Sequence, residues 1–332
     1  MDLMFFEDVV PGEAPLFGNY EVTKDEIFEF AAEFDPQPFH LDEEAAKKTL
    51  LGGLSASGWH TAAISMRLLY DSFLRHVASM GALGVDELKW LKPVRPGDRL
   101  SLRRHVLEKK ESQSRPDLGI VHTQSDVINQ NGEVMMTLRA PLMLRRRGTS
   151  PQVRSPDAAR EAAPEVSQAA FAKPYHYAFF EDLVIGQRLD LEPFTFDKAA
   201  ILAFGKKYDP QPFHVDDAAA RKSQFGGLVA SGWHTAAVYM RQLIESRKKL
   251  FAETSARGEK PPQIGPSPGF TNLRWRAPVY AGDRLRFTSE IAGKRPISRP
   301  GWGLVFAQNR AFNQDDRLVF EFQGTAFWQL RP

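Results

Sequence analysis

The chain has 332 residues and a formal net charge of +2, with 42% hydrophobic and 25% charged residues. Its length favours two domains, and its composition is ordinary for a globular protein that buries real cores. The small net charge gives no electrostatic case for a nucleic acid or an anionic membrane as partner. The absence of cysteine excludes disulfides, thiolate nucleophiles and cysteine-ligated metal.

The first residues, MDLMFFEDVVPGEAP, include acidic side chains and no long apolar run, so we expect no secretory signal. No stretch approaches the roughly 18 uninterrupted apolar residues of a membrane span. A cytoplasmic location is therefore the default expectation.

The N-terminal region predicts a short strand followed by a helix. The strand is expected at about 16–22 and the helix over TKDEIFEFAAEF (23–34), whose apolar residues recur at helical spacing. Thr23 suits the N-cap, and Glu26 would complete a capping box. Pro36 ends the helix, because the residue before a proline is disfavoured in the helical region.

The next stretch, DPQPFH (35–40), is predicted to be an irregular loop stiffened by its two prolines. A short helix (42–50) and the pair Gly52-Gly53 follow it. A longer helix is expected over roughly 58–77, and its broadly apolar composition indicates that it is buried.

The remainder of the N-terminal half predicts β-structure. Candidate strands are 86–92, 98–111, 118–129 and 133–145, and Asn131-Gly132 between the last two is a strong hairpin signal. One long helix with four or five antiparallel strands favours a sheet wrapped around that helix.

This whole pattern occurs twice. Residues 35–67 and 209–241 align without a gap at an offset of 174, with 23 of 33 positions identical. Further matches pair FFEDVVPG with FFEDLVIG and LKWLKPVRPGDRL (88–100) with LRWRAPVYAGDRL (273–285). A period this long predicts tandem domains, which we place at 1–145 and 175–332.

The segment between the two copies, 146–174, is rich in Pro, Ala, Ser and charged residues. This composition is typical of an exposed linker. Arg145, Arg146 and Arg147 stand where it begins. We interpret them as a solvated run at a domain edge, with a cationic contact for an anionic ligand as the alternative.

The repeated hexapeptide places an aspartate and a histidine five residues apart, as Asp35 with His40 and as Asp209 with His214. Such a pair can activate water, since one group removes a proton while the other orients or donates. The structural alternative is that Asp35 caps a turn and His40 is a partly exposed polar residue. Repetition does not decide between them, because duplication also copies turns.

A second candidate element is GGLSASGWH (52–60), which places Ser57 and Gly58 at the expected start of the central helix. The first amides of a helix lack internal partners, and glycine lets a substrate oxygen approach them. The alternative is that Ser57 is an N-cap and Gly58 permits tight packing. Trp59 and His60 are expected to pack or cap.

Other common catalytic patterns are absent from the sequence. No histidine spacing suits a metal site, so no metal is predicted. There is no G-x-S-x-G elbow, no G-x-G-x-x-G and no P-loop.

These residues resemble the signature of the MaoC-like dehydratase family, the (R)-specific enoyl-CoA hydratases of the hot-dog fold. That signature is Asp-x-Asn-Pro-x-His followed, 18 residues after the His, by a glycine at the start of the central helix. Gln37 and Gln211 depart from it by replacing the Asn, and Phe34 and Tyr208 stand where a glycine often precedes the Asp. The matching residues are Asp35, Pro38, His40 and Gly58, and Asp209, Pro212, His214 and Gly232.

The resemblance implies an α+β double hot-dog fold, with two antiparallel sheets joined edge to edge and each wrapped around a central helix. It implies reversible addition of water to a trans-2-enoyl-CoA, giving an (R)-3-hydroxyacyl-CoA, with an acyl-CoA as the small-molecule partner and no cofactor. The aspartates would act as bases and the histidines would orient water. The oxyanion or substrate-binding residues would be Ser57, Gly58, Ser231 and Gly232.

Two alternatives remain open from the sequence. A hot-dog thioesterase would use the same scaffold and oxyanion site, although the Asp–His spacing argues against it. A non-catalytic acyl-CoA-binding protein would keep the loop for its shape. The sequence also leaves open whether double hot dogs assemble into a homo-oligomer.

Overall fold

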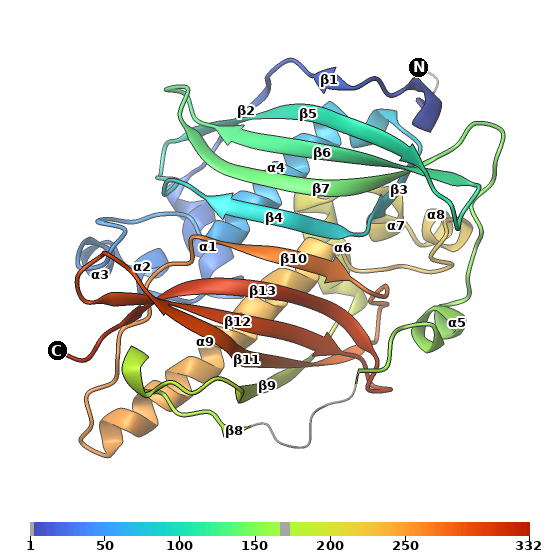
Figure 1. Cartoon of the computed structure of the whole chain (residues 1–332). Helices are drawn as coiled ribbons and strands as arrows, with labels where there is room; N and C mark the ends of the chain where they lie inside the picture. Colours follow the sequence, from blue (N-terminus) through green and yellow to red (C-terminus); the bar gives the residue numbers. More distant parts are fainter. Residues whose placement is uncertain (1–2, 167–172) are drawn as a thin grey trace.

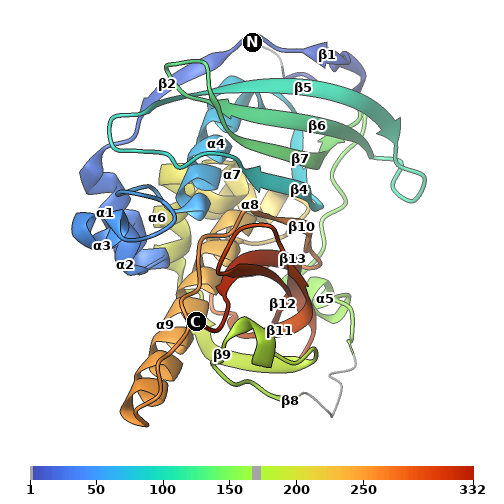
Figure 2. The same cartoon turned by 60° about the vertical axis from the view of Figure 1, so that its left-hand side comes forward.

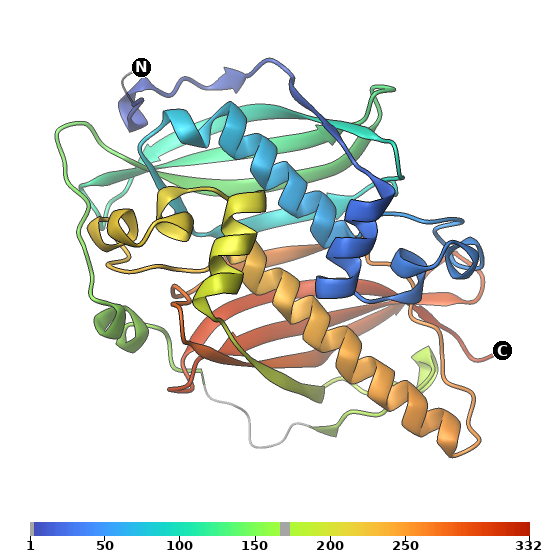
Figure 3. The ribbon, with the colours of Figure 1, turned by 180° about the vertical axis from the view of Figure 1, so that it is seen from behind.

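The two halves of the chain form one continuous sheet, and each half wraps around its own long helix (Figures 1 and 3). The structure is a computed structural model that describes residues 3–166 and 173–332. Within them the strand order is β1-β5-β6-β7-β4-β10-β13-β12-β11-β9-β8, and β4 pairs antiparallel with β10 at the centre. Apart from β8, which runs parallel to β9, these neighbours are antiparallel. The predicted double hot-dog architecture is confirmed.

The N-terminal half closely follows the prediction, because each main strand lies within two residues of its expected position. The unpredicted additions are short strands and a 3₁₀ turn at Phe6–Asp8, and the helix expected over roughly 58–77 ends at Ser72 and is followed by a 3₁₀ turn at Leu74–His76. The strands are β1 (Gly12–Glu13), β2 (Phe17–Glu21), β3 (Ser79–Ala82), β4 (Gly84–Trp90), β5 (Arg99–Glu111), β6 (Leu118–Ile128) and β7 (Val134–Arg145). The helices are α1 (Lys24–Phe34), α2 (Pro38–Leu41), α3 (Glu43–Lys47) and α4 (Gly58–Ser72).

The C-terminal half repeats this order with a longer central helix, since α9 has 25 residues and α4 has 15. A 3₁₀ turn at Phe180–Asp182 repeats the one near the N-terminus. The strands are β8 (Lys173–Pro174), β9 (Gln187–Thr195), β10 (Gly269–Trp275), β11 (Arg284–Pro296), β12 (Trp302–Phe312) and β13 (Leu318–Gln329). The helices are α6 (Lys198–Tyr208), α7 (Pro212–Val215), α8 (Asp217–Lys222) and α9 (Gly232–Ala256).

The seam between the halves depends on one glycine in each central strand. Gly84 in β4 has φ 157° and Gly269 in β10 has φ 150°, a region that side chains rarely adopt. A Cβ on Gly84 would lie 2.1 Å from the carbonyl oxygen of Leu273, and one on Gly269 would lie 2.1 Å from that of Leu88. The close approach of β4 and β10 therefore requires glycine at these two equivalent positions of the repeat.

The core lies between the sheet and the helices that cover one face of it, as the turned view in Figure 2 shows. In α4, Ala62, Ala63 and Ile64 are at most 1% exposed, so the prediction of a buried central helix is confirmed. Helices α4 and α9 contact each other, and the Trp59 and Trp233 rings at their N-terminal ends lie 6.4 Å apart. No helix among the described residues has the length and apolar character of a transmembrane span.

The start of α1 is predicted only in part. Thr23 is the N-cap and its side chain accepts from the Glu26 amide at 3.1 Å, as expected. The prediction of a capping box is wrong, because the Glu26 carboxylate points into the protein and not toward the backbone amide of Thr23. It accepts from the Tyr20 hydroxyl at 2.5 Å and lies 3.4 Å from Nε2 of the buried His60. The Glu26 side chain therefore binds partners outside the helix start and does not form the local capping contact.

The predicted linker is not simply exposed. Helix α5 (Pro156–Glu161) lies within it, and Ala159 and Ala163 are buried. Arg160 fastens this helix to the C-terminal half through an ion pair of 2.8 Å with the buried Asp283. The prediction of an exposed segment is therefore wrong for these residues, and positions 167–172 lie outside the described residues.

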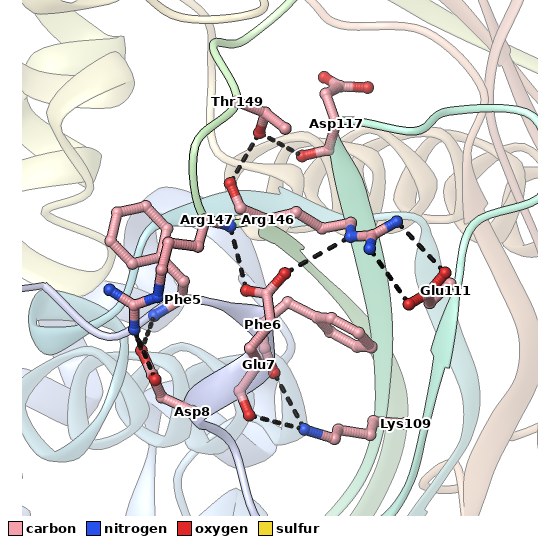
Figure 4. A network of polar contacts seen from close by, with 10 residues as sticks. All are labelled: Phe5, Phe6, Glu7, Asp8, Lys109, Glu111, Asp117, Arg146, Arg147 and Thr149. Atoms are coloured by element: carbon pink, nitrogen blue, oxygen red, sulfur yellow. Dashed lines mark hydrogen bonds and ion pairs between the residues drawn. The ribbon is translucent and has the colours of Figure 1, made fainter.

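The arginine run at the end of β7 ties down the N-terminal segment (Figure 4). Arg146 lies 3.4 Å from a Glu7 carboxylate oxygen, and Arg147 pairs with Asp8 at 2.5 Å. The Arg145 guanidinium lies 5.2 Å from the centre of the Phe5 ring. The interpretation of a solvated run holds for the exposed Arg147 but is incomplete, since Arg146 and Arg147 also pair with carboxylates of the repeated FFED motif.

Candidate active site

The first Asp–His pair lies where α1 gives way to α2. Asp35 follows the last residue of α1, and Pro38 begins the single turn of α2 that carries His40. The predicted irregular loop is therefore wrong for residues 38–40, which lie in α2, because proline at the first helical position is preset for a turn of helix. The turn brings His40 Nε2 to 3.5 Å from Asp35 Oδ2. Both residues are buried, at 5% and 2% exposure.

Three protein groups hold this pair in place. The Ser57 hydroxyl donates to Asp35 Oδ2 at 2.6 Å, and the Gln37 side-chain amide donates to Oδ1 at 2.9 Å. His40 Nδ1 lies 2.8 Å from the Ser55 carbonyl oxygen, which can only accept. The proton on Nδ1 is therefore fixed, and Nε2 is the nitrogen that faces the carboxylate.

The second copy reproduces this geometry. His214 Nε2 lies 3.3 Å from Asp209 Oδ2, and His214 Nδ1 lies 2.8 Å from the Val229 carbonyl oxygen. Asp209 accepts from Ser231 at 2.6 Å and from Gln211 at 3.0 Å. Burial acts to raise the pKa of Asp209, but the charge of His214 and these hydrogen bonds outweigh it and hold that pKa below its usual range. The glutamines that depart from the family signature thus hold the carboxylates.

The helix-start glycines combine a backbone amide without a protein partner and tight packing, the two interpretations that the sequence allowed. Gly58 is the first residue of α4, and its amide donates to none of the residues that the structure describes. A Cβ at Gly58 would lie 2.5 Å from Trp90 Cε2, and one at Gly232 would lie 2.2 Å from Trp275 Cε2. Glycine is therefore required for indole packing, and the same absence of a side chain leaves the amide open to a ligand.

The two serines before these glycines are N-caps. Ser57 accepts from the Trp59 amide at 3.2 Å, and Ser231 accepts from the Trp233 amide at the same distance. Each hydroxyl also donates to the aspartate of its own site. Both serines are about 1% exposed. Their hydroxyl groups therefore contact protein atoms, and the contact with the aspartate positions its carboxylate.

A cavity of about 410 Å³ adjoins the first pair. Asp35, His40 and Gly58 line one part of it, and they come from the N-terminal half. The C-terminal half supplies most of the remaining wall, including residues of α9, β11, β12 and β13. The Asp–His pair comes from one half, and the greater part of the wall of its cavity comes from the other.

The second pair also borders a pocket to which both halves contribute, on a smaller scale. Its pocket is about 190 Å³ and is lined by Asp209 and His214 together with Leu142 and Met143 of β7. The Ser79 hydroxyl crosses between the halves to donate to the Gln211 side-chain oxygen at 2.7 Å. The two sites thus share one geometry at the Asp–His pair and differ in the space beside it.

Trp90 and Trp275 are site residues that the sequence reasoning missed. Trp90 lines the larger cavity, and its indole nitrogen donates to the Gly58 carbonyl oxygen at 2.9 Å. The signal was present, because both tryptophans occupy the same position in the repeated LKW and LRW motifs. The expectation for His60 is confirmed: it is buried and stacks on Phe30 with ring centroids 4.6 Å apart.

The buried His234 makes stability sensitive to acid. Burial lowers its pKa to about 3 in the folded protein, against about 6.5 unfolded. Between these values the unfolded chain binds a proton that the folded chain does not, so stability falls as pH falls below about 6.5. We expect His234→Phe, which keeps a ring against Phe204, to reduce the loss of unfolding free energy between pH 7.5 and 5.0 by about 2 kcal/mol.

Urea unfolding followed by circular dichroism at the two pH values measures this difference. His176→Phe is the matched control, because His176 is exposed. An unchanged pH dependence in His234→Phe would show that His234 does not contribute.

Comparison with known proteins agrees with the fold and with the duplication of the domain. The MaoC like domain family matches residues 7–128 and 182–303. Mesaconyl-CoA hydratase from Cereibacter sphaeroides is 27% identical over 241 residues, which span 67% of this chain and 64% of that protein.

Two solved structures share the fold over nearly their whole length. A MaoC domain protein dehydratase from Chloroflexus aurantiacus has a TM-score of 0.73 at 19% identity, over 99% of this chain and 98% of the other. A Mycobacterium tuberculosis protein with a double hot-dog fold has a TM-score of 0.69 at 13% identity, over 98% of each chain. These structures show the fold, and the two domain matches show that the chain belongs to the MaoC-like dehydratase family and carries its domain twice.

Proposed function

We propose that the chain adds water reversibly to a trans-2-enoyl-CoA and gives an (R)-3-hydroxyacyl-CoA. The observation that carries the proposal is that each buried Asp–His pair borders a cavity together with an unpaired helix-start amide. Family membership supports hydro-lyase chemistry, and the similarity to mesaconyl-CoA hydratase supports a CoA thioester as substrate.

In the proposed reaction Asp35 is the base. It takes a proton from water as the water oxygen bonds to C3 of the enoyl group, and the electrons of the double bond move toward the thioester oxygen. The proton then returns through the Asp35–His40 pair to C2, so one water is added and no cofactor enters. The hydrogen bonds from Ser57 and Gln37 hold the carboxylate in the orientation that this transfer needs.

His40 orients the attacking water and shares the proton transfer. Its Nδ1–H is committed to the Ser55 carbonyl oxygen, so the ring presents Nε2 to the space beside Asp35. The Gly58 amide holds the thioester oxygen as that oxygen gains enolate charge. A donor of this kind contributes on the order of 3 kcal/mol to transition-state stabilisation.

The proposal is tested by incubating the protein with trans-2-enoyl-CoAs of several chain lengths and following the loss of enoyl absorbance. We expect turnover to a 3-hydroxyacyl-CoA of (R) configuration and almost none with the double variant Asp35→Asn/Asp209→Asn. Hydration at the wild-type rate by the double variant would refute the assignment.

The same assay separates the alternatives. Release of free CoA thiol from a saturated acyl-CoA, without hydration, would identify a thioesterase. Binding of enoyl-CoAs without any turnover would identify a non-catalytic acyl-CoA-binding protein.

A further inference from the structure

The larger cavity contains a cation that has no carboxylate beside it. Arg247, on α9, lines this cavity at the part formed by the C-terminal half. Its Nε is buried without a hydrogen-bond partner. Among residues 3–166 and 173–332, no carboxylate oxygen lies within 4.0 Å of its guanidinium. Arg247 as a whole is only partly buried, so its positive charge lies at the cavity wall without an acidic partner.

Two other arginines provide a comparison within the same chain. Arg188 and Arg310 also have a buried Nε that makes no hydrogen bond. Arg188 nevertheless lies 3.0 Å from an Asp190 carboxylate oxygen, and Arg310 lies 3.9 Å from one of Glu321. Among the described residues, Arg247 therefore differs from both in lacking an acidic partner.

The residues around Arg247 do not neutralise it. Its guanidinium lies 5.6 Å from the centre of the Trp328 ring. Burial raises the pKa of the neighbouring Tyr175 to about 12, although Arg247 opposes this rise, and burial also raises the pKa of Tyr177. Both phenols are therefore uncharged at neutral pH and leave the positive charge of Arg247 unpaired.

Asn309, a polar residue in the part of the wall formed by the C-terminal half, already has hydrogen-bond partners. Asn309 accepts through its side-chain oxygen from the Tyr239 hydroxyl at 2.5 Å and from the Ser289 hydroxyl at 2.8 Å. Most of the wall near it is apolar, with Leu243, Ile291 and Val305 among its members. The cavity thus combines an apolar lining with one unpaired cation.

The N-terminal half lacks this arrangement. The repeat places Phe73 opposite Arg247 at an offset of 174, and Arg104 opposite Ser289 at an offset of 185. There the Arg104 guanidinium lies 3.9 Å from the centre of the Phe73 ring, so the two side chains pack on each other. In the C-terminal half the helix carries the arginine and the strand carries a small serine. An unpaired cation facing a cavity is therefore a property of one half.

We infer that the larger cavity binds an acyl group that carries a carboxylate at the end remote from the thioester, and that this carboxylate pairs with Arg247. The apolar wall accommodates the carbon chain, and the guanidinium supplies the charge-assisted hydrogen bonds that a carboxylate prefers. The inference rests on the proposed function, because it takes the Asp35–His40 cavity as an acyl-CoA site.

The test is calorimetric binding of two saturated thioesters of equal length, adipyl-CoA with a terminal carboxylate and hexanoyl-CoA with a terminal methyl, extended to shorter and longer pairs. We expect at least one carboxylate-terminated thioester to bind about 10- to 100-fold more tightly than its methyl-terminated partner. Arg247→Gln should abolish this preference and leave the methyl-terminated affinity within about threefold. Saturated thioesters cannot be hydrated, so the result does not depend on turnover.

Two variants serve as controls. Arg247→Lys keeps a positive charge and should retain part of the preference, and urea unfolding of both Arg247 variants checks that they fold. Arg188→Gln alters an arginine that has a carboxylate partner and does not line the cavity, so it should leave the preference unchanged.

The other outcomes separate this inference from the proposed function. An equal loss of affinity for both thioesters and for free CoA in Arg247→Gln would mean that Arg247 binds a CoA phosphate, which overturns the inference. Hydration of methyl-terminated enoyl-CoAs with no carboxylate preference at any length would overturn the inference alone. Failure of every acyl-CoA to bind would overturn the proposed function with it.

Discussion

Asp35→Asn should lower kcat/KM for a bulky enoyl-CoA by about 10²- to 10⁴-fold, whereas Asp209→Asn should leave that value nearly unchanged. Asparagine keeps the shape of the side chain and can still accept from Ser57, but it cannot take a proton from water. The difference between the two variants follows from the space beside each pair. The first adjoins about 410 Å³ and the second about 190 Å³, so a bulky acyl group fits only at Asp35.

The measurement is the initial hydration rate of both single variants with a short and a long enoyl-CoA. The short substrate fits both sites, so each single variant should lose only part of its turnover. Equal losses from the two variants with the long substrate would contradict the assignment of bulky acyl groups to the larger cavity. Unfolding midpoints within error of the wild type would exclude a loss of folded protein as the cause.

Gly58→Ala should lower kcat for the same bulky substrate about 100-fold and destabilise the protein by about 1–3 kcal/mol. The new methyl group would lie 2.5 Å from Trp90 Cε2, so the helix start and the indole must move apart. This movement displaces the amide that is proposed to hold the thioester oxygen. One residue thus links packing and catalysis.

A second substitution tests this link. Gly58→Ala combined with Trp90→Leu removes the clash, so we expect part of the lost stability to return, and part of kcat with it because the amide regains its position. Gly293→Ala is the matched control, because a Cβ there would lie 3.7 Å from Phe306, an ordinary contact. Wild-type kcat in Gly58→Ala would exclude the proposed role of the amide.

The Asp–His pair was predictable because its geometry is local. Five residues and two prolines set the turn that brings His40 to Asp35, and the repeat carries the same turn to Asp209 and His214. The strands were predictable for the same reason, since alternation and the Asn131-Gly132 turn act over short distances. The error at Pro38 was also local, because an irregular loop was expected where the structure has a single turn of helix.

The errors involve side chains whose partners lie far away in the sequence. Glu26 fits a capping box, yet Tyr20 and His60 bind its carboxylate instead. Arg147 is exposed as predicted, but its pairing with Asp8, 139 positions earlier, was missed. Such contacts depend on how the elements pack, and local pattern does not determine that packing.

The cavity was the least predictable feature. It exists where α9 faces small residues such as Ala307, Gly324 and Ala326 on neighbouring strands, and the strand register decides that they line one space. That this space adjoins Asp35 depends on the seam between β4 and β10. The sequence contains all of these residues, but no short-range rule groups them.

Placing each Asp–His pair against the opposite half has a consequence for selectivity. In a dimer of identical subunits, symmetry repeats every substitution at both sites, so neither wall changes alone. Here the halves are one chain, and Arg247 faces one cavity without a counterpart in the other. Because the halves are joined in one chain, the walls of the two cavities can carry different residues while the repeated Asp, His and Gly residues stay the same. On the proposed function, one reaction can then be matched to two different acyl groups within a single molecule.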